Sequence, residues 1–230
     1  MSIRDKLDIS AYLVVGPENT LGRPVKDIIA DAIRAGFTCL QIRSKVASAR
    51  ELIALCGEAA DVLRAAGKQD DVALLVDERL DVVLAARAQG IKVDGIHVGQ
   101  SDIPTDVCRH LLGPDSIVGL SARTDELLDY VQHTDTSDID YFGAGPLHET
   151  ATKPDCGLDK NGHVITRSFA ELTELHRVSP IPVVVGGGVK ARDLPELKAT
   201  GVEGFFVVSA VAGADNPYEA ARKLVDLWRA

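Results

Sequence analysis

The sequence predicts an α/β fold in which residues 1–230 form a single (β/α)8 TIM barrel. Three observations favour it. Short apolar runs rich in β-branched residues recur eight times, and stretches with helical periodicity lie between them. No linker or low-complexity tract divides the chain. With 230 residues, 46% of them hydrophobic, the chain can bury a full core.

The eight expected strands are short and apolar, and they cover residues 11–15, 38–42, 72–76, 94–98, 116–120, 139–143, 181–185 and 204–208. The clearest helical segments, several of which close at a glycine, are 25–36, 49–67, 79–90 and 218–230. Such alternation indicates parallel strands joined by crossover helices, and eight repeats favour a closed barrel over an open doubly wound sheet. The longest irregular stretch, 144–167, follows the sixth strand. In a barrel, binding and catalytic residues gather at the carboxyl ends of the strands.

The charge balance excludes a nucleic-acid surface and favours small-molecule partners. Lys and Arg number 25 against 34 Asp and Glu, the net charge is -9, and only 4% of the residues are aromatic. The first residues are too polar for a signal peptide, and no apolar run approaches the roughly 18 residues of a membrane span. We therefore expect a cytoplasmic protein that does not enter a membrane. Whether it forms a homo-oligomer stays open.

The four cysteines lie far apart and do not have the spacing of a zinc site: Cys39, Cys56, Cys108 and Cys156. We expect them to be buried free thiols.

Two cations and an amide follow the second strand. Gln41, Arg43 and Lys45 are spaced by two residues, so their side chains point to the same side of an extended segment. Arginine offers a planar fork and lysine a point charge, which together suit a diphosphate. The alternative is a charged loop whose side chains are solvated.

Carboxylates follow the third and fourth strands. Asp77, Glu78 and Asp102 come at the ends of neighbouring strands, where they can share one hard cation. Mg²⁺ commonly takes one or two protein carboxylates and completes its shell with water and substrate phosphate. The alternative is helix capping, because Asp77 and Asp102 both precede helical runs. We expect His97 to pack inside the barrel and not to bind metal.

The last four strands end in hydroxyls, glycines and a lysine. Ser121 follows the fifth strand, and Gly186 to Gly188 follow the seventh, where barrels often bind a phosphate. Ser121 can also be a helix cap, and the glycines can form only a tight turn. The others follow the sixth and eighth strands, and they are Thr150, Thr152, Lys153 and Ser209. The glycines, Ser209 and the two threonines predict a second anion subsite, for a monophosphate ester. Lys153 is expected at the first subsite, with Arg43, Lys45 and the carboxylates.

Three motifs resemble the thiamine phosphate synthase family. "QIRSK" (41–45) resembles its Gln-Leu-Arg-x-Lys, "DGIHVGQSD" (94–102) its Asp-Gly-x-His-x-Gly-Gln-x-Asp, and "GPLHETATK" (145–153) its Gly-Pro-x-x-x-Thr-x-Thr-Lys. The resemblance implies a transferase of thiamine biosynthesis. It would condense 4-amino-2-methyl-5-hydroxymethylpyrimidine diphosphate with a thiazole phosphate, giving thiamine phosphate and pyrophosphate.

The resemblance also implies the roles of individual residues. Mg²⁺ would be held by Glu78 and Asp102. The residues implied in catalysis are Arg43, Lys45, Ser121 and Lys153. The substrate-binding set includes these four together with Gln41, Ile42, Ser44, Asp77, Thr150, Ala151, Thr152, Gly188, Val208 and Ser209.

The chain departs from the family at one pair of residues. It has Asp77 and Glu78 where the family usually has Asn and Asp. We expect Asp77 to lie near the diphosphate as an uncompensated anion unless Arg79 or Lys45 screens it. Two alternative functions stay open: a thiazole tautomerase with His148 as general acid or base, and a non-catalytic ligand-binding barrel.

Overall fold

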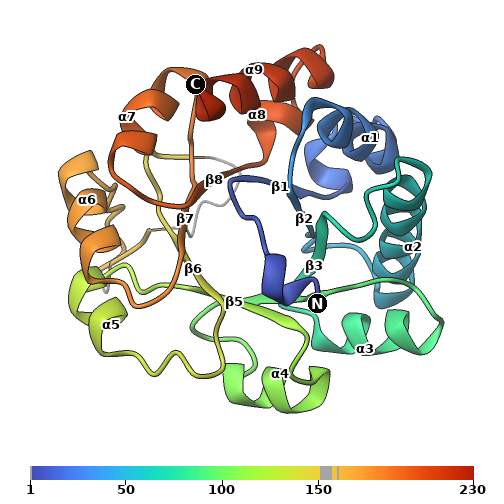
Figure 1. The fold of residues 1–230 in the computed structure, drawn as a ribbon, viewed down its shortest axis with the longest axis horizontal. Helices are drawn as coiled ribbons and strands as arrows, with labels where there is room; N and C mark the ends of the chain where they lie inside the picture. The colour runs from blue at the N-terminus through green and yellow to red at the C-terminus, as the bar shows by residue number, and fades with distance from the viewer. Residues whose placement is uncertain (1, 151–156, 160) are drawn as a thin grey trace.

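The computed structural model describes residues 2–150, 157–159 and 161–230. Its strands are all parallel and close into one barrel in the order β1 to β8, which confirms the predicted fold (Figure 1). The strands are β1 (Ala11–Val15), β2 (Cys39–Ile42), β3 (Ala73–Asp77), β4 (Gly95–Val98), β5 (Ile117–Ser121), β6 (Tyr141–Ala144), β7 (Val183–Val185) and β8 (Gly204–Val207).

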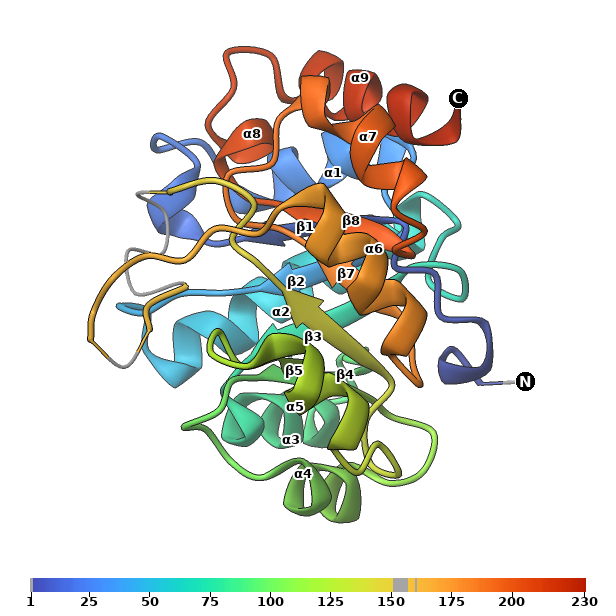
Figure 2. The same ribbon diagram turned by 90° about the vertical axis from the view of Figure 1, so that its left-hand side faces the viewer.

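Helices surround the barrel on the outside, and both termini lie at the end of the barrel opposite the segment between β6 and α6 (Figure 2). The helices are α1 (Val25–Ala35), α2 (Ala49–Ala65), α3 (Leu80–Ala88), α4 (Thr105–Leu112), α5 (Leu127–His133), α6 (Phe169–Val178), α7 (Leu194–Ala199), α8 (Ser209–Ala212) and α9 (Pro217–Arg229). Short 3-10 turns are η1 (Arg4–Lys6), η2 (Pro17–Asn19) and η3 (Ala191–Asp193).

The strand boundaries agree with the expected ones to within two residues. The largest differences occur at the starts of β6 and β7. Pro182 has no N–H to donate to a neighbouring strand, so β7 begins at Val183 although the apolar run begins earlier. In the segment expected to be irregular, Leu158 and Val164 form an isolated antiparallel bridge.

Alternation along each strand divides the core into two layers. Side chains such as Leu13 and Ile42 are buried between the strands and the helices. Tyr12 and Tyr141 belong to a second cluster inside the barrel. Large rings fit there because glycines face them. A Cβ on Gly119 would lie only 2.2 Å from Cζ of Tyr141.

Three of the cysteines are buried and free, as expected: Cys39, Cys56 and Cys108. Burial raises the pKa of the Cys56 thiol to about 12, so this group stays protonated at neutral pH. Cys156 lies outside the described residues.

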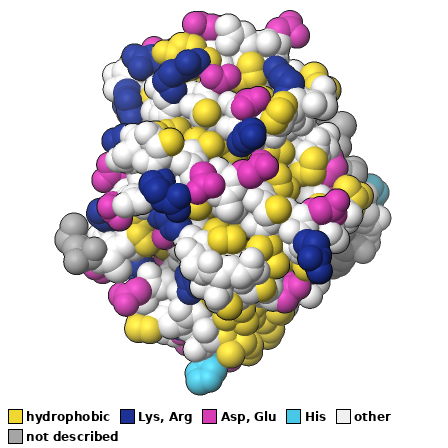
Figure 3. All heavy atoms as spheres, turned by 90° about the vertical axis from the view of Figure 1, so that its right-hand side faces the viewer, with side chains coloured by type: hydrophobic (Ala, Val, Ile, Leu, Met, Phe, Trp, Pro, Cys, Tyr) yellow, Lys and Arg dark blue, Asp and Glu magenta, His cyan; other side chains and the backbone are white. Residues whose placement is uncertain are grey.

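The surface agrees with the charge balance of the sequence. On the face drawn in Figure 3, basic and acidic side chains are interspersed and do not form one continuous basic patch. Among the described residues, no helix combines the length and the apolar character that a membrane crossing requires.

Candidate active site

A cavity of about 800 Å³ opens at the carboxyl ends of the strands. It brings together most of the residues that the sequence singles out: Gln41, Arg43, Lys45, Asp77, Glu78, Asp102, Ser121, Thr150, Gly188, Val208 and Ser209. Ala151, Thr152 and Lys153 lie outside the described residues, so their predicted roles stay predictions.

Asp77 is the centre of a polar cluster at the ends of β2 and β3. Its Oδ2 lies 3.2 Å from Nε of Arg43, and its Oδ1 accepts a hydrogen bond of 3.1 Å from Nε2 of Gln41. The Asp77 side chain is only 9% exposed, so this pairing is largely shielded from water. The expectation of an uncompensated anion was therefore wrong. Arg79 does not supply the compensation, because it pairs with Asp81 instead.

Glu78 reaches the same cavity because its backbone departs from strand geometry. Its φ of 60° lies in the left-handed region, which is uncommon for a residue other than glycine. The carbonyl of His97 fixes the turn by accepting the N–H of Glu78 at 2.8 Å. In regular alternation Asp77 and Glu78 would face opposite sides, whereas here both line the cavity. The carboxylate of Glu78 pairs with Nζ of Lys45.

Asp102 does not cap α4, whose N-cap is Pro104 without a side-chain hydrogen bond. Its Oδ2 accepts the backbone N–H of Gly99 at 2.6 Å, which fixes the turn after β4, and its side chain also lines the cavity. Among the described residues, no group of three or more His, Cys, Asp and Glu side chains is arranged to hold a metal. Two carboxylates still fit Mg²⁺, because this ion takes most of its oxygens from water and substrate.

Ile42 and Ser44 do not line the cavity. Ile42 is fully buried between the barrel and its helices, as the alternation with Gln41 and Arg43 requires. The hydroxyl of Ser44 donates to Oε1 of Glu18 at 2.7 Å, and the same oxygen accepts the N–H of Lys45. These contacts hold the β2 loop against η2 and so position Lys45 and Arg43.

The glycines after β7 form the opposite wall of the cavity. Gly187 and Gly188 have φ values of 79° and 73°, which only glycine adopts readily. A Cβ on Gly187 would lie 2.5 Å from Cβ of Pro146, and one on Gly188 would lie 2.8 Å from the carbonyl oxygen of His148. The glycines therefore make a tight turn against the β6 loop, and Gly187 and Gly188 line the cavity.

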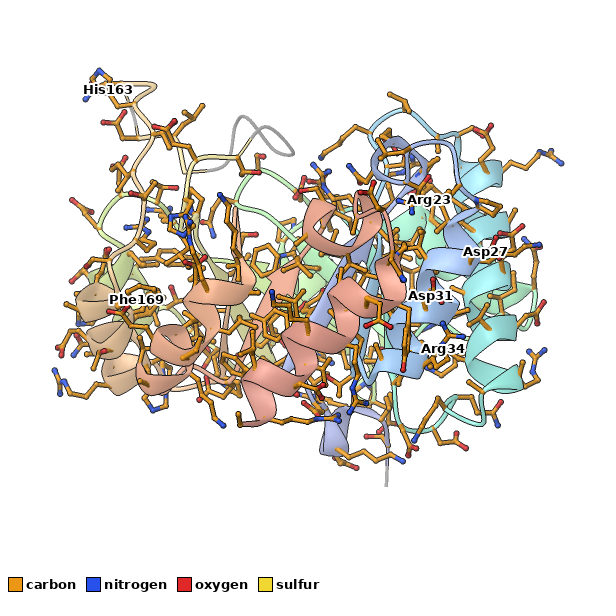
Figure 4. The ribbon with its side chains drawn as sticks, turned by 90° about the horizontal axis from the view of Figure 1, so that it is seen from above. Arg23, Asp27, Asp31, Arg34, His163 and Phe169 are labelled. Carbon is orange, nitrogen blue, oxygen red and sulfur yellow. The ribbon has the colours of Figure 1, made fainter. Side chains whose placement is uncertain are left out.

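Val208 and Ser209 follow β8, just where α8 begins, and both line the cavity. Val208 packs against the cluster inside the barrel. The guanidinium of Arg23 fixes the far end of α8, donating to the carbonyl of Ala212 at 2.8 Å and to that of Ala214 at 2.7 Å (Figure 4). Arg23 thus ties the β1 loop to the wall that holds Ser209.

Several cavity residues were missed by the sequence reasoning. Val14 and Phe206 form an apolar part of the cavity wall, Gln100 lies beside Ser121, and Lys190 follows the glycines. The sequence pattern could have predicted Val14 and Phe206. Alternation along each strand places Val14 with Tyr12 and Phe206 with Val208 on the inward side. Gln100 donates to the carbonyl of Ser121 at 2.6 Å, a contact between segments that spacing along the chain does not reveal.

His97 packs inside the barrel, as expected. Its Nδ1 lies 2.9 Å from Oη of Tyr141, and its Nε2 lies 2.9 Å from Oγ of Ser121. Its ring stacks on that of Tyr141 with 5.5 Å between the centroids. Both nitrogens are therefore engaged by hydroxyl groups.

His148 lies beside the cavity and has a carboxylate partner. Its Nε2 lies 2.9 Å from Oδ2 of Asp193, which also accepts the N–H of Lys190 at 2.8 Å. This arrangement joins the β6 loop to η3 behind the glycine turn. His163 is not among the residues that line the cavity, and it lies in the stretch that leads to α6 (Figure 4).

Known proteins are similar in sequence to this chain over almost its full length. A family model described as thiamine monophosphate synthase matches residues 11–211. The thiamine-phosphate synthase of Corynebacterium efficiens is 39% identical over 224 residues, which cover 97% of this chain and 96% of that protein. The thiamine-phosphate synthase of Desulfitobacterium hafniense strain DCB-2 is 34% identical over 228 residues and covers 97% of this chain and 99% of its own.

Solved structures are similar to this chain in fold. The thiamine phosphate pyrophosphorylase from Pyrococcus furiosus superposes with a TM-score of 0.78 and 27% identity, covering 99% of this chain and 98% of its own. A 3-hexulose-6-phosphate synthase, with a TM-score of 0.60 and 15% identity, shares the barrel fold alone. The family model and the two full-length relatives show that this chain belongs to the thiamine monophosphate synthase family.

Proposed function

We propose that this chain is a thiamine-phosphate synthase. It joins 4-amino-2-methyl-5-hydroxymethylpyrimidine diphosphate to a thiazole phosphate. In the reaction the thiazole nitrogen forms a bond to the pyrimidine methylene carbon while the bond from that carbon to the diphosphate oxygen breaks. Pyrophosphate leaves with the electron pair, and thiamine phosphate is the second product.

One observation carries the proposal: a single cavity has two walls that suit two different anions. The ends of β2 to β5 contribute Arg43, Lys45 and Ser121 together with the carboxylates Glu78 and Asp102. The ends of β7 and β8 contribute Gly188 and Ser209. Because β2 to β5 and β7 to β8 are different arcs of a closed barrel, a diphosphate on one wall and a monophosphate on the other share the space between them.

The residues of the first wall stabilise a leaving group. Positive charge builds up on the pyrimidine methylene, where the ring's amino group stabilises it, so the protein need not supply a nucleophile. Its task is to neutralise the diphosphate and to hold both substrates in line. Arg43 can donate two N–H bonds to phosphate oxygens, and Lys45 adds a second positive charge. Glu78 and Asp102 would hold Mg²⁺, which supplies further positive charge for the diphosphate when bound.

The second wall holds the thiazole phosphate. Gly188 allows the phosphate to approach the backbone, and the hydroxyl of Ser209 donates to it. Val14, Phe206 and Val208 offer apolar surface for the uncharged rings. This division gives each substrate its own set of donors and places the thiazole nitrogen next to the methylene group.

A thiazole tautomerase is not favoured by the site. That reaction has no use for two cations beside a pair of carboxylates. His148, the residue such a reaction would use, is not among the described residues that line the cavity, and its Nε2 contacts Asp193. A non-catalytic barrel could bind the same anions with Arg43 and Lys45, but it would release no pyrophosphate.

Pyrophosphate release tests the proposed reaction. Purified protein is incubated with Mg²⁺ and both substrates, and pyrophosphate is measured over time. We expect release only when both substrates and Mg²⁺ are present. Release without the thiazole phosphate would indicate a hydrolase, and no release under any condition would contradict the proposal.

A substitution at Ser209 tests the second wall. Ser209→Ala should raise KM for the thiazole phosphate by roughly 10- to 150-fold, the loss expected for one hydrogen bond to a charged group, and leave KM for the pyrimidine diphosphate unchanged. Gly188→Val is a poorer test, because its Cβ would collide with the His148 carbonyl and the positive φ would strain the chain. Steady-state kinetics with each substrate varied in turn give both constants. Equal increases for the two substrates would mean that Ser209 does not mark a separate subsite.

A further inference from the structure

A chain of hydrogen bonds runs from inside the barrel to the cavity. Oη of Tyr12 lies 2.9 Å from Oη of Tyr141, which in turn lies 2.9 Å from Nδ1 of His97. On the other side of the imidazole, Nε2 lies 2.9 Å from Oγ of Ser121. Both tyrosines are buried, whereas His97 and Ser121 line the cavity. The series of hydrogen bonds therefore begins at Tyr12, which is buried, and ends at Ser121, which faces the cavity.

The buried hydroxyl of Tyr12 determines which group donates in each hydrogen bond. Burial raises the pKa of Tyr12 and of Tyr141 well above the usual value, so both hydroxyls keep their protons at neutral pH. A buried hydroxyl proton needs an acceptor, because an unpaired buried donor is costly. Within the described part of the chain, the structure gives Tyr12 Oη one hydrogen-bond partner, Tyr141 Oη. Tyr12 is therefore the donor in this pair.

The direction then passes from Tyr141 to the imidazole. Tyr141 accepts the proton of Tyr12, so its own proton goes to Nδ1 of His97. A ring nitrogen that accepts a hydrogen bond carries no proton, which makes His97 neutral with its proton on Nε2. That N–H donates to Oγ of Ser121. Because Oγ of Ser121 accepts this hydrogen bond, the hydroxyl proton of Ser121 cannot point toward His97. It can therefore point into the cavity.

We propose that Tyr141 is a positioning residue that fixes the tautomer of His97, and that His97 thereby presents the hydroxyl of Ser121 to the cavity as a hydrogen-bond donor. This inference rests on the proposed function, because such a donor serves an anionic ligand. Oxygens of a diphosphate accept hydrogen bonds and do not donate them, so a Ser121 hydroxyl turned toward His97 would meet the ligand with lone pairs. A hydroxyl that already accepts one bond is also polarised and donates more strongly.

The tautomer can be measured in the ligand-free protein. Nitrogen NMR of isotope-labelled histidine distinguishes a protonated from an unprotonated ring nitrogen, and comparison with His97→Gln identifies the His97 signals among the six histidines. We expect a proton on Nε2 and none on Nδ1 at neutral pH. A proton on Nδ1, alone or together with Nε2, overturns the inference.

Two conservative variants refine this measurement. In Tyr141→Phe the partner of Nδ1 is lost, so His97 should populate both tautomers. In Tyr12→Phe the proton of Tyr141 still has Nδ1 as its acceptor, so the Nε2 tautomer should persist. Phenylalanine keeps the ring packing in both variants, and the two differ only in which hydroxyl is removed. Identical tautomer behaviour in the two variants would contradict the proposed order of donors.

A double-mutant cycle connects the tautomer to binding. Tyr141→Phe should raise KM for the pyrimidine diphosphate roughly three- to tenfold in the wild-type background. In the Ser121→Ala background the same change should have no further effect, because the hydroxyl that it orients is absent. Tyr218→Phe is the control. Tyr218 lies on α9, where the guanidinium of Arg34 covers its ring, and it is not part of these hydrogen bonds. An equal loss in both backgrounds would show that Tyr141 acts only through packing and would overturn the inference.

The outcomes separate this inference from the proposed function. An active enzyme whose His97 carries its proton on Nδ1 contradicts the inference alone. A protein with the expected tautomer that releases no pyrophosphate contradicts the proposed function, and with it the purpose assigned to the Ser121 donor.

Discussion

Replacing Arg43 with alanine should lower kcat/KM for the pyrimidine diphosphate roughly 30- to 1,000-fold. This corresponds to the loss of about 2 to 4 kcal/mol of transition-state stabilisation, the range for removing a preorganised donor from a developing anion. The structure adds a second cause. Without the guanidinium, the nearly buried carboxylate of Asp77 loses the cation that lies 3.2 Å from its Oδ2, so it repels the incoming diphosphate more strongly.

The two causes can be separated with two further variants. Arg43→Ala combined with Asp77→Asn removes the repulsive carboxylate as well, so it should recover part of the lost activity. Arg79→Ala is the matched control, because Arg79 pairs with Asp81 on the surface and should leave kcat/KM unchanged. Circular dichroism checks that each variant is folded. Wild-type kinetics for a folded Arg43→Ala variant would mean that the diphosphate does not bind at this wall.

Glu78→Gln should lose most of the Mg²⁺-dependent activity, on the order of 100-fold at limiting Mg²⁺, because a metal ion contributes several kcal/mol of charge stabilisation. Asp77→Asn should change activity by only a few fold. Its one amide oxygen can accept from Nε of Arg43, and its NH2 group can donate to the side-chain oxygen of Gln41 once the Gln41 amide turns over. Asp77 is also not the proposed metal ligand. The measurement is a Mg²⁺ titration of pyrophosphate release for both variants.

The titration also distinguishes metal binding from a purely structural role of Glu78. Its carboxylate pairs with Lys45, so glutamine could act by freeing that lysine. If Glu78 holds the metal, high Mg²⁺ should partly restore the activity of Glu78→Gln. A loss that no Mg²⁺ concentration relieves would assign the effect to Lys45. An inactive Asp77→Asn beside an unaffected Glu78→Gln would place the metal on Asp77.

The fold could be predicted because its strands are continuous apolar runs. A strand of a parallel barrel is buried on both faces, so it differs clearly from the polar loops around it. The expected run 11–15 coincides with β1, whereas β7 begins two residues late because Pro182 cannot donate to the sheet. The short bridge between Leu158 and Val164 was not predicted, since two paired residues leave no periodic signal.

The site could be predicted as a set of residue types but not as a set of pairs. Strand-end position and spacing were enough to bring Arg43, Asp102 and Ser209 to one cavity. The pairing of Asp77 with Arg43 crosses from β3 to β2, and nothing in the spacing of either segment indicates it. The left-handed backbone of Glu78 was equally hidden, because no glycine marks that turn.

The hydrogen-bond chain behind Ser121 shows the same limit of sequence reasoning. Tyr12 and Tyr141 lie 129 residues apart and read as ordinary aromatic residues of two strands. Only the closure of the barrel brings their hydroxyls together. Only the burial of Tyr12 determines which group donates in each hydrogen bond.

The stoichiometry of the products tests most directly whether this cavity joins the two substrates. Both substrates are mixed with the protein and Mg²⁺, the reaction is stopped at intervals, and thiamine phosphate and pyrophosphate are quantified by mass spectrometry and by an enzymatic assay. We expect the two products to accumulate in equal amounts, since one bond-forming event releases one pyrophosphate. Pyrophosphate without thiamine phosphate, or neither product from folded protein, would contradict the claim that this cavity joins the two substrates.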